Sequence, residues 1–284
     1  MNNGPVVLGL ILRALFSVAY DAERPTERGP VGGRSVEVLG RSVEEYRGIP
    51  YAKPPVGELR FKPPVQAERW DEVLDATNGR TACAQVRANG EVLSGDIVYT
   101  EDCLYLNVWT TRKASERAPV LVWIYGGGFT YGSASYDNYT GAVLAAKTDC
   151  VVVSMNYRVG ILGFLNADSP EAPGNVGLLD QHMALVWIKE NIHNFGGDPS
   201  RVTLFGESAG GMSVHAHVLS PMSRGLFRRA VMLSGNMKAL DLVDAVHESV
   251  SMGDAVAAIV GCSDGKQKTL VSHPEDVVNC LRAK

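Results

Sequence analysis

A serine framed by glycines stands in the last third of the chain, in a setting typical of a nucleophile. Residues 206–210 have the sequence GESAG, with the strand-like run RVTLF before them and the helical pattern GMSVHAHVL after them. A sharp turn from strand to helix exposes a serine side chain, and small neighbours leave room for its strained backbone. The free N–H groups at the start of the helix favour a developing negative charge. Ser208 is therefore the predicted nucleophile.

Three consecutive glycines follow the strand-like run at residues 119–125. This run, Gly126-Gly127-Gly128, can turn the backbone so that its N–H groups point at a reacting oxyanion, or it can be no more than a flexible turn. The N–H of Ala209, directly after the serine, would be a further donor. Together these groups would hold the negative oxygen of a tetrahedral intermediate.

Of the six histidines, the two nearest to Ser208 in the sequence are not placed to act as its general base. His215 follows the serine on the same predicted helix and lies roughly 10 Å along it. His217 is farther away and points to another face. The H-x-H spacing of these two could suggest a metal, but side chains at i and i+2 diverge on a helix. We therefore predict neither a metal nor a cofactor.

The elements that would position these groups alternate along the chain. Apolar, β-branched runs predict strands at residues 103–110, 119–126, 150–158, 201–206 and 228–235. Between them, apolar residues at helical spacing predict a helix from residue 175 to 195: Leu178, Leu179, Met183, Val186, Trp187 and Ile192. We predict an α/β fold with a mainly parallel twisted sheet and helices on both faces. The Gly-, Pro- and Arg-rich residues 21–35 are predicted to be a linker into this domain.

Longer motifs surround these elements in a fixed order. They are YRGIPYAKPPVGELRFKPP, EDCLYLNVW, WIYGGGF, NYRVGILGFL, APGNVGLLDQHMALVWIKENI and FGGDPSRVTLFGESAGG. With them, the chain resembles the type-B carboxylesterase/cholinesterase family of α/β-hydrolases from about residue 35 to residue 237, and again near residue 280. The resemblance implies Ser208 as the nucleophile, and Gly127, Gly128 and Ala209 as the oxyanion hole. Glu207 matches the family's glutamate beside the serine and not its triad acid.

In the family that the chain resembles, the triad acid and histidine come later than residue 284, in the order serine, acid, histidine. We therefore expect residues 35–284 to be the N-terminal part of an α/β-hydrolase domain that lacks its C-terminal strands. Loss of triad members leaves only about 10³–10⁴-fold catalysis over water. Efficient turnover by this chain alone is not expected.

The five cysteines suggest two disulfide bonds and one free thiol. Pairing Cys83 with Cys103 and Cys262 with Cys280 would close two loops of about 20 residues, each worth roughly 3 kcal/mol in the chain-entropy model. The family resemblance supports these pairs as the family's first two disulfides. Cys150, in the apolar run CVVVSM, is predicted to be a buried free thiol.

Three further signals concern the cellular compartment. Residues 1–19 hold a short apolar stretch that ends in SVA, which predicts a signal peptide, with a disordered or partly buried leader as the alternative. Asn138, in the sequon Asn138-Tyr139-Thr140, would accept a glycan in a secreted chain. Together with the cysteine pairs, these signals predict a secreted or extracellular protein.

The remaining composition narrows the partners. A net charge of −4 gives no basic field for nucleic acid, and no other apolar run is long enough for a transmembrane span. The predicted partner is a small carboxylic ester, and the sequence does not indicate an oligomeric state. Cholinesterases hold a quaternary ammonium on a tryptophan between their first two cysteines. Here Leu93 stands near its place and Tyr99 is the only aromatic residue of that loop, which favours a general carboxylesterase.

The leading hypothesis is a serine esterase that works through an acyl-enzyme on Ser208. The alternatives are a catalytically inactive cholinesterase-like binding or adhesion protein, and a ligand-sequestering variant that is acylated once and stalls. The intact sequence around Ser208 favours an enzyme, whereas the missing general base favours the alternatives.

Overall fold

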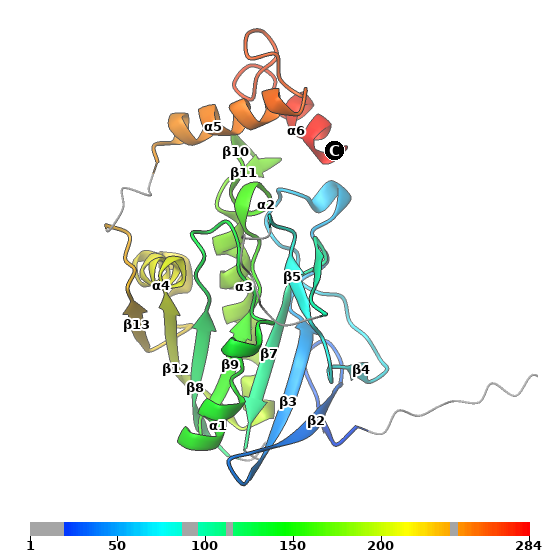
Figure 1. Cartoon of the computed structure of the whole chain (residues 1–284), viewed down its shortest axis with the longest axis vertical. Coiled ribbons are helices and arrows are strands. Elements are labelled where there is room, and N and C mark those ends of the chain that lie inside the picture. The colour runs from blue at the N-terminus through cyan, green and yellow to red at the C-terminus, as the bar shows by residue number, and fades with distance from the viewer. Residues whose placement is uncertain (1–19, 87–95, 112–115, 239–243) are drawn as a thin grey trace, which may run out of the picture.

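The computed structural model describes residues 20–86, 96–111, 116–238 and 244–284, and one large sheet forms its centre (Figure 1). From one edge to the other its strands are β1 (Ala22–Arg24), β2 (Val31–Val38), β3 (Arg41–Pro50), β7 (Tyr105–Thr110), β9 (Val151–Met155), β8 (Ala118–Ile124), β12 (Gly197–Glu207) and β13 (Arg229–Leu233), with β4 (Leu74–Asp75) beside β2. Two small sheets pair β5 (Thr81–Cys83) with β6 (Val98–Thr100) and β10 (Asn166–Ser169) with β11 (Ala172–Pro173). The predicted signal peptide, residues 1–19, lies outside the described residues.

The sheet is parallel in the part that carries the predicted nucleophile. β9, β8, β12 and β13 are parallel neighbours, and Phe205 on β12 pairs with Trp123 on β8 and with Val231 on β13. The strands β1, β2, β3 and β7 are antiparallel to one another, and β7 pairs with β9 in the same manner. Because β8 and β12 are neighbours and run in the same direction, the residues that follow them lie close together, where the carboxyl ends of the parallel strands meet. The triple glycine and Ser208 are therefore brought together.

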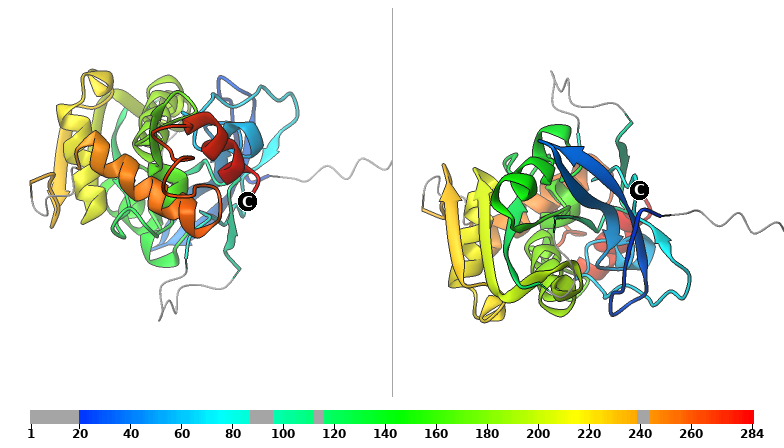
Figure 2. Two further views of the ribbon diagram at one scale, coloured as in Figure 1. Left: turned by 90° about the horizontal axis from the view of Figure 1, so that it is seen from above. Right: turned by 90° about the horizontal axis from the view of Figure 1, so that it is seen from below.

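Helices cover both faces of the sheet. Successive residues of a strand point to opposite faces, and Trp109 packs with α1 (Ala142–Thr148) whereas Val108 packs in the core beneath α3 (Val176–Asn191). Figure 2 shows α1 and α3 on opposite sides of the strands. The helix α4 (Ala209–Leu219) contacts β8, β12 and β13 and adds Val214 to the core beneath α3. The predicted α/β class is confirmed. Within the described ranges every helix is too short or too polar to serve as a transmembrane span.

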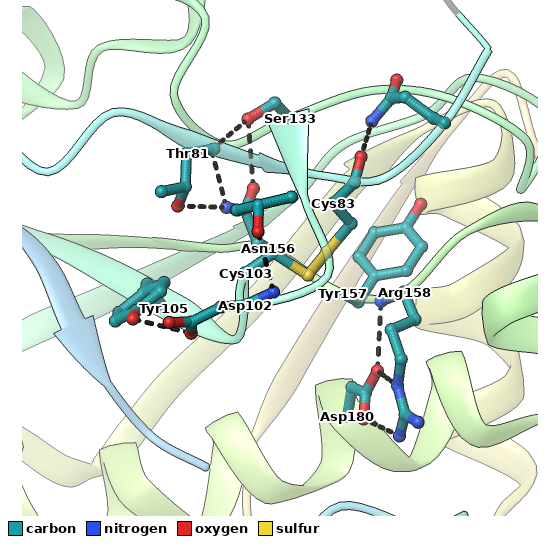
Figure 3. The surroundings of a disulfide bond; sticks show 12 residues. Thr81, Cys83, Asp102, Cys103, Tyr105, Ser133, Asn156, Tyr157, Arg158 and Asp180 are labelled. Carbon is teal, nitrogen blue, oxygen red and sulfur yellow. Dashed lines mark hydrogen bonds and ion pairs between the residues drawn. A yellow bond between two sulfur atoms is a disulfide. The ribbon is translucent and has the colours of Figure 1, made fainter. Parts of the chain in front are cut away.

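The helix predicted from residue 175 is α3, but its buried face is more polar than its sequence pattern indicates. Four of the apolar residues that predicted it are only half-buried: Leu178, Leu179, Met183 and Val186. The face that is turned to the core carries Asp180 and Gln181, and both are fully buried. Arg158 pairs with Asp180 through its backbone N, its Nε and its Nη2, at 3.0, 2.8 and 2.6 Å (Figure 3). Such partners make the burial of polar groups tolerable, and a count of apolar residues does not reveal them.

Residues 21–35 contribute to the sheet and are not the linker that their composition predicts. β1 pairs with the first residues of β2, where Val31 is fully buried. A Cβ atom on Gly32 would lie 2.2 Å from the ring of Tyr20, and one on Gly33 would lie 2.6 Å from the ring of Tyr46. Glycine is therefore required for the close approach of a strand to two aromatic rings, and here it does not indicate flexibility.

Both predicted disulfides are present. Cys83–Cys103 joins β5 to the residues before β7, and Cys262–Cys280 joins the residues after α5 (Val246–Ile259) to α6 (Pro274–Arg282). The helices α5 and α6 lie together at one end of the molecule (Figure 1) and share a small core of their own with β10 and β11. Cys150 is free, as predicted, but it is half-buried and not buried, because it precedes the first residue of β9 and lies outside that strand's buried run.

Candidate active site

Ser208 lies at the sharp turn between β12 and α4, in a backbone conformation that side chains rarely adopt. Its φ is 55° and its ψ is −122°. A Cβ atom on Gly206 would lie 2.5 Å from the backbone of Gly210, and one on Gly210 would lie 2.1 Å from the carbonyl oxygen of Ile124. The two glycines that frame the serine are therefore required by the packing of the turn. Strain of this kind persists where the surroundings impose it, and such sites are often functional.

Backbone hydrogen bonds from two sides hold the turn. The N–H of Ser208 donates to the carbonyl oxygen of Leu233 on β13 at 2.9 Å, and the N–H of Met212 donates to the carbonyl oxygen of Ser208 at 2.9 Å. A Cβ atom on Gly235 would lie 2.0 Å from that same carbonyl oxygen. The backbone of Ser208 is thus fixed by the neighbouring strand as well as by its own helix.

The triple glycine lies against this turn. A Cβ atom on Gly126 would be 3.1 Å from the Cβ of Ser208, so the end of β8 touches the serine. Gly127 and Gly128 have φ values of 111° and 60°, and the N–H groups of residues 130 and 131 donate to the carbonyl oxygen of Gly127. The N–H groups of Gly127 and Gly128 have no hydrogen-bond partner among the described residues. Ala209, the first residue of α4, is 1% exposed. The structure therefore places Gly126 against Ser208, with Gly127 and Gly128 next to Gly126 in the chain and Ala209 next to the serine.

Amide side chains bond to the second half of the loop at residues 126–134, called the glycine turn from here on, and the sequence patterns did not reveal these bonds. Gln85 accepts from the N–H of Gly132 at 2.7 Å and donates to the carbonyl oxygens of Gly132 and Cys83 at 2.9 and 2.8 Å. Asn156 accepts from the N–H of Ala134 at 2.9 Å and donates to the carbonyl oxygen of Thr81 at 2.9 Å, so that it links the turn to β5 (Figure 3). The first disulfide, at the end of β5, therefore lies next to the groups that hold the glycine turn.

Glu207 ends β12 and its side chain is directed toward the glycine turn. A Cβ atom on Gly126 would lie 3.0 Å from Glu207 Oε2. Burial raises the pKa of the Tyr139 hydroxyl, and the negative charge of Glu207 raises it further. The Tyr139 ring packs on Trp123 with 5.4 Å between the ring centroids. The carboxylate next to Ser208 therefore acts electrostatically on Tyr139, whose ring packs on Trp123.

The six histidines are all described, and none is hydrogen-bonded to Ser208, whose hydroxyl has no hydrogen-bond partner within the described ranges. His215 Nδ1 accepts from the N–H of Met237 at 3.1 Å, and His182 Nε2 bonds the carbonyl oxygen of Met222 at 3.1 Å. His217 is buried between Gln181 and Ser223. The remaining ones, His193, His247 and His273, lie in η3 (Ile192–Phe195), in α5 and before α6.

No group of three or more metal-binding side chains is found in the part of the chain that the structure describes. Asn138 and Thr140 of the predicted sequon are both exposed at η2 (Asp137–Tyr139). Leu93, which the sequence places near the expected tryptophan, lies outside the described residues.

The comparison with known proteins decides the family. The model of the Carboxylesterase family matches residues 21–284. This chain belongs to the carboxylesterase family. It is 45% identical over 267 residues to an acetylcholinesterase of Bungarus fasciatus, 44% identical over 283 residues to an acetylcholinesterase of Gallus gallus, and 39% identical over 284 residues to acetylcholinesterase 4 of Caenorhabditis briggsae. The α/β-hydrolase fold and the resemblance carried by the sequence motifs are both confirmed.

The alignments with these carboxylesterase-family relatives cover most of this chain but not of theirs. They include 91%, 96% and 96% of the present chain, and 43%, 36% and 46% of the relatives' own lengths, in the order given. The chain therefore spans less than half the length of the curated relatives it matches.

Proposed function

We propose that this chain carries the nucleophile and the oxyanion donors of a carboxylic ester hydrolase. The conformation of Ser208 supports the proposal most directly, because a strained backbone at a non-glycine residue between two required glycines is the kind of feature that clusters at active sites. The N–H groups of Gly127 and Gly128 have no hydrogen-bond partner among the described residues, and Gly126, directly before them, lies against Ser208. Glu207, next to the serine, contributes charge to the site and is not assigned a proton-transfer role.

The proposed chemistry is acyl transfer in two halves. Ser208 Oγ forms a bond to the ester carbonyl carbon, while the carbonyl oxygen takes the negative charge and the N–H groups of Gly127, Gly128 and Ala209 stabilise it. The bond between the carbonyl carbon and the alcohol oxygen then breaks, the proton lost from Ser208 Oγ goes to the departing alcohol, and the acyl group stays on the serine. Water then attacks the acyl-enzyme, which releases the acid and restores the hydroxyl.

A fluorophosphonate probe tests this proposal. Its phosphorus forms a bond with Ser208 Oγ as fluoride leaves, and its P=O oxygen occupies the oxyanion position. We expect stoichiometric labelling of the wild-type chain, mapped to Ser208 by peptide mass spectrometry, and no labelling of Ser208→Ala. Equal labelling of the two proteins would show that Ser208 is not the reactive group.

One observation favours a second candidate, a ligand-sequestering protein that is acylated once. No histidine contacts Ser208 in the described structure, and deacylation normally requires a general base. A p-nitrophenyl ester separates the candidates. A burst of one nitrophenolate per chain without steady release supports sequestration, whereas a steady rate that Ser208→Ala abolishes supports hydrolysis. Labelling by neither reagent would favour a binding or adhesion role.

The substrate and the compartment complete the proposal. The absence of tryptophan between Cys83 and Cys103 supports an uncharged ester over a choline ester, since a cation is held best on an indole face. Comparison of acetylthiocholine with an uncharged thioester of the same acyl group tests this preference. Two disulfides and the exposed sequon support an oxidising, secreted or extracellular location.

A further inference from the structure

Five buried groups form a continuous chain of hydrogen bonds that ends in the first turn of α4. Gln181 Nε2 on α3 donates to Ser213 Oγ at 3.0 Å, and Ser213 Oγ donates to the carbonyl oxygen of Ala209 at 2.9 Å. On its other side, Gln181 Oε1 bonds His217 Nε2 at 3.1 Å, and His217 Nδ1 bonds Ser223 Oγ at 2.8 Å. All five residues are at least 96% buried.

The donor and the acceptor of each bond in this series of hydrogen bonds follow from the group at its end, the carbonyl oxygen of Ala209. The carbonyl oxygen of Ala209 can only accept, so the Ser213 hydroxyl donates to it and accepts from the amide of Gln181. Gln181 Oε1 must then accept from His217, which places the histidine proton on Nε2 and leaves Nδ1 to accept from Ser223. Every donor points in one direction, from η4 (Pro221–Ser223) toward the residue after Ser208. Burial keeps His217 neutral and lowers its pKa to about 4, which preserves this order.

From this arrangement we propose that Gln181 is a positioning residue for the oxyanion hole. The inference depends on the proposed function, in which the N–H of Ala209 is an oxyanion donor. The hydroxyl of Ser213 fixes the carbonyl group of Ala209 and with it the orientation of the first turn of α4. Gln181 determines which way that hydroxyl points, because its amide N–H₂ occupies the acceptor side of Ser213 Oγ. Small displacements of such groups change reaction rates strongly, since catalysis depends on accurate placement.

The substitution Gln181→Glu reverses the hydrogen bond between residue 181 and Ser213, so that Ser213 becomes the donor, and it does not reduce the volume of the side chain. A carboxylate accepts from both His217 and Ser213, so the Ser213 proton turns away from Ala209 and the link to the active-site turn is lost. Asn191→Asp is the matched control. Asn191 is another fully buried amide on α3, and it accepts from the N–H of Glu27 at 2.7 Å and donates to Trp187 at 2.9 Å, away from α4. Both substitutions replace a buried amide by an acid, but only Gln181→Glu changes the series of hydrogen bonds that leads to Ala209.

The measurement is the second-order rate constant for fluorophosphonate labelling of Ser208, normalised to the folded fraction from urea unfolding. We expect Gln181→Glu to slow labelling at least about tenfold, a part of the 10²–10³-fold that loss of an oxyanion donor costs, and Asn191→Asp to stay within about twofold of wild type. Ser213→Ala removes only a hydroxyl and should slow labelling too. The double variant should be no slower than Ser213→Ala alone, because both changes break the same link.

The outcomes separate the two proposals. If wild type is not labelled at Ser208, the proposed function fails and this inference fails with it. If wild type is labelled and Gln181→Glu behaves like Asn191→Asp, the proposed function stands and Gln181 has no more than a structural role. Additive effects of Gln181→Glu and Ser213→Ala would also overturn the inference, because they would place the two residues on separate routes.

Discussion

The buried histidine of α4 makes the stability of the fold depend on pH. His217 is 4% exposed, and burial lowers its pKa from the ordinary 6.5 to about 4, with the nearby His182 as a smaller cause. In the unfolded chain the imidazole is in water and regains its ordinary pKa. The substitution His217→Gln removes this titration, and its side-chain amide can still donate to Gln181 and accept from Ser223.

The direction and size of the effect follow from these two pKa values. Above about pH 6.5 neither the folded nor the unfolded state binds the proton, so the contribution of His217 does not reduce the free energy of unfolding. Between pH 6.5 and pH 4 the unfolded state binds more protons, and the free energy of unfolding falls as the pH is lowered. Below pH 4 both states are protonated and the loss is complete, at about 3 kcal/mol. At pH 5 the loss from this one group amounts to about 2 kcal/mol.

Urea unfolding at pH 8 and at pH 5, followed by tryptophan fluorescence, measures this loss. Other groups also titrate in this range, so the informative quantity is the difference between wild type and His217→Gln. We expect wild type to lose about 2 kcal/mol more than the variant between the two pH values. His247→Gln, an exposed histidine on α5, should lose as much as wild type. If His217→Gln loses as much as wild type, His217 is not buried in a neutral state and the proposed direction of the hydrogen-bond chain is wrong.

Three further predictions concern other parts of the molecule. Gly33→Ala should lower the free energy of unfolding by about 1–3 kcal/mol, because its methyl group would overlap the ring of Tyr46; an unchanged urea midpoint would contradict this. Cys280→Ser should destabilise the α5–α6 end by about 3 kcal/mol, since the bond to Cys262 closes a loop with a sequence separation of 18, and increased proteolysis there with unchanged probe labelling is the expected result. Chain secreted from eukaryotic cells should lose mass on treatment with an N-glycosidase, and Asn138→Gln should abolish that loss; a chain of identical mass before and after treatment would refute glycosylation of the exposed sequon.

The sequence predicts the elements of the site because their requirements are local. A nucleophile turn needs small residues at fixed offsets, and the glycines around Ser208 satisfy that need within five positions. The strands at residues 119–126 and 201–206 were predicted from continuous apolar runs, and their parallel pairing brings Gly126 against Ser208. The two disulfides were predicted from spacing and resemblance, and both are present.

What the sequence did not predict depends on contacts between distant residues. Gln85 and Asn156 hold the glycine turn, but isolated amides in a sequence give no sign of the carbonyl groups they will meet. The buried face of α3 was missed for the same reason, since Gln181 is polar by type and is buried only because Ser213 and His217 satisfy it. At residues 21–35 the composition predicted a linker, but these residues belong to the sheet, and Gly32 and Gly33 allow it to pack closely against aromatic rings.

The hydrogen bond between Ser208 and Leu233 connects the predicted nucleophile to the outermost described strand of the sheet. β13 is the outermost strand at that side of the described sheet, and the side chains of Val231, Met232 and Leu233 are each more than 40% exposed. Outer strands are the first to fray in local openings. Ser208 therefore takes one of its backbone restraints from the outermost described strand of the parallel half. A displacement of β13 would therefore reach Ser208 both through this hydrogen bond and through Gly235, which packs on the Ser208 carbonyl oxygen.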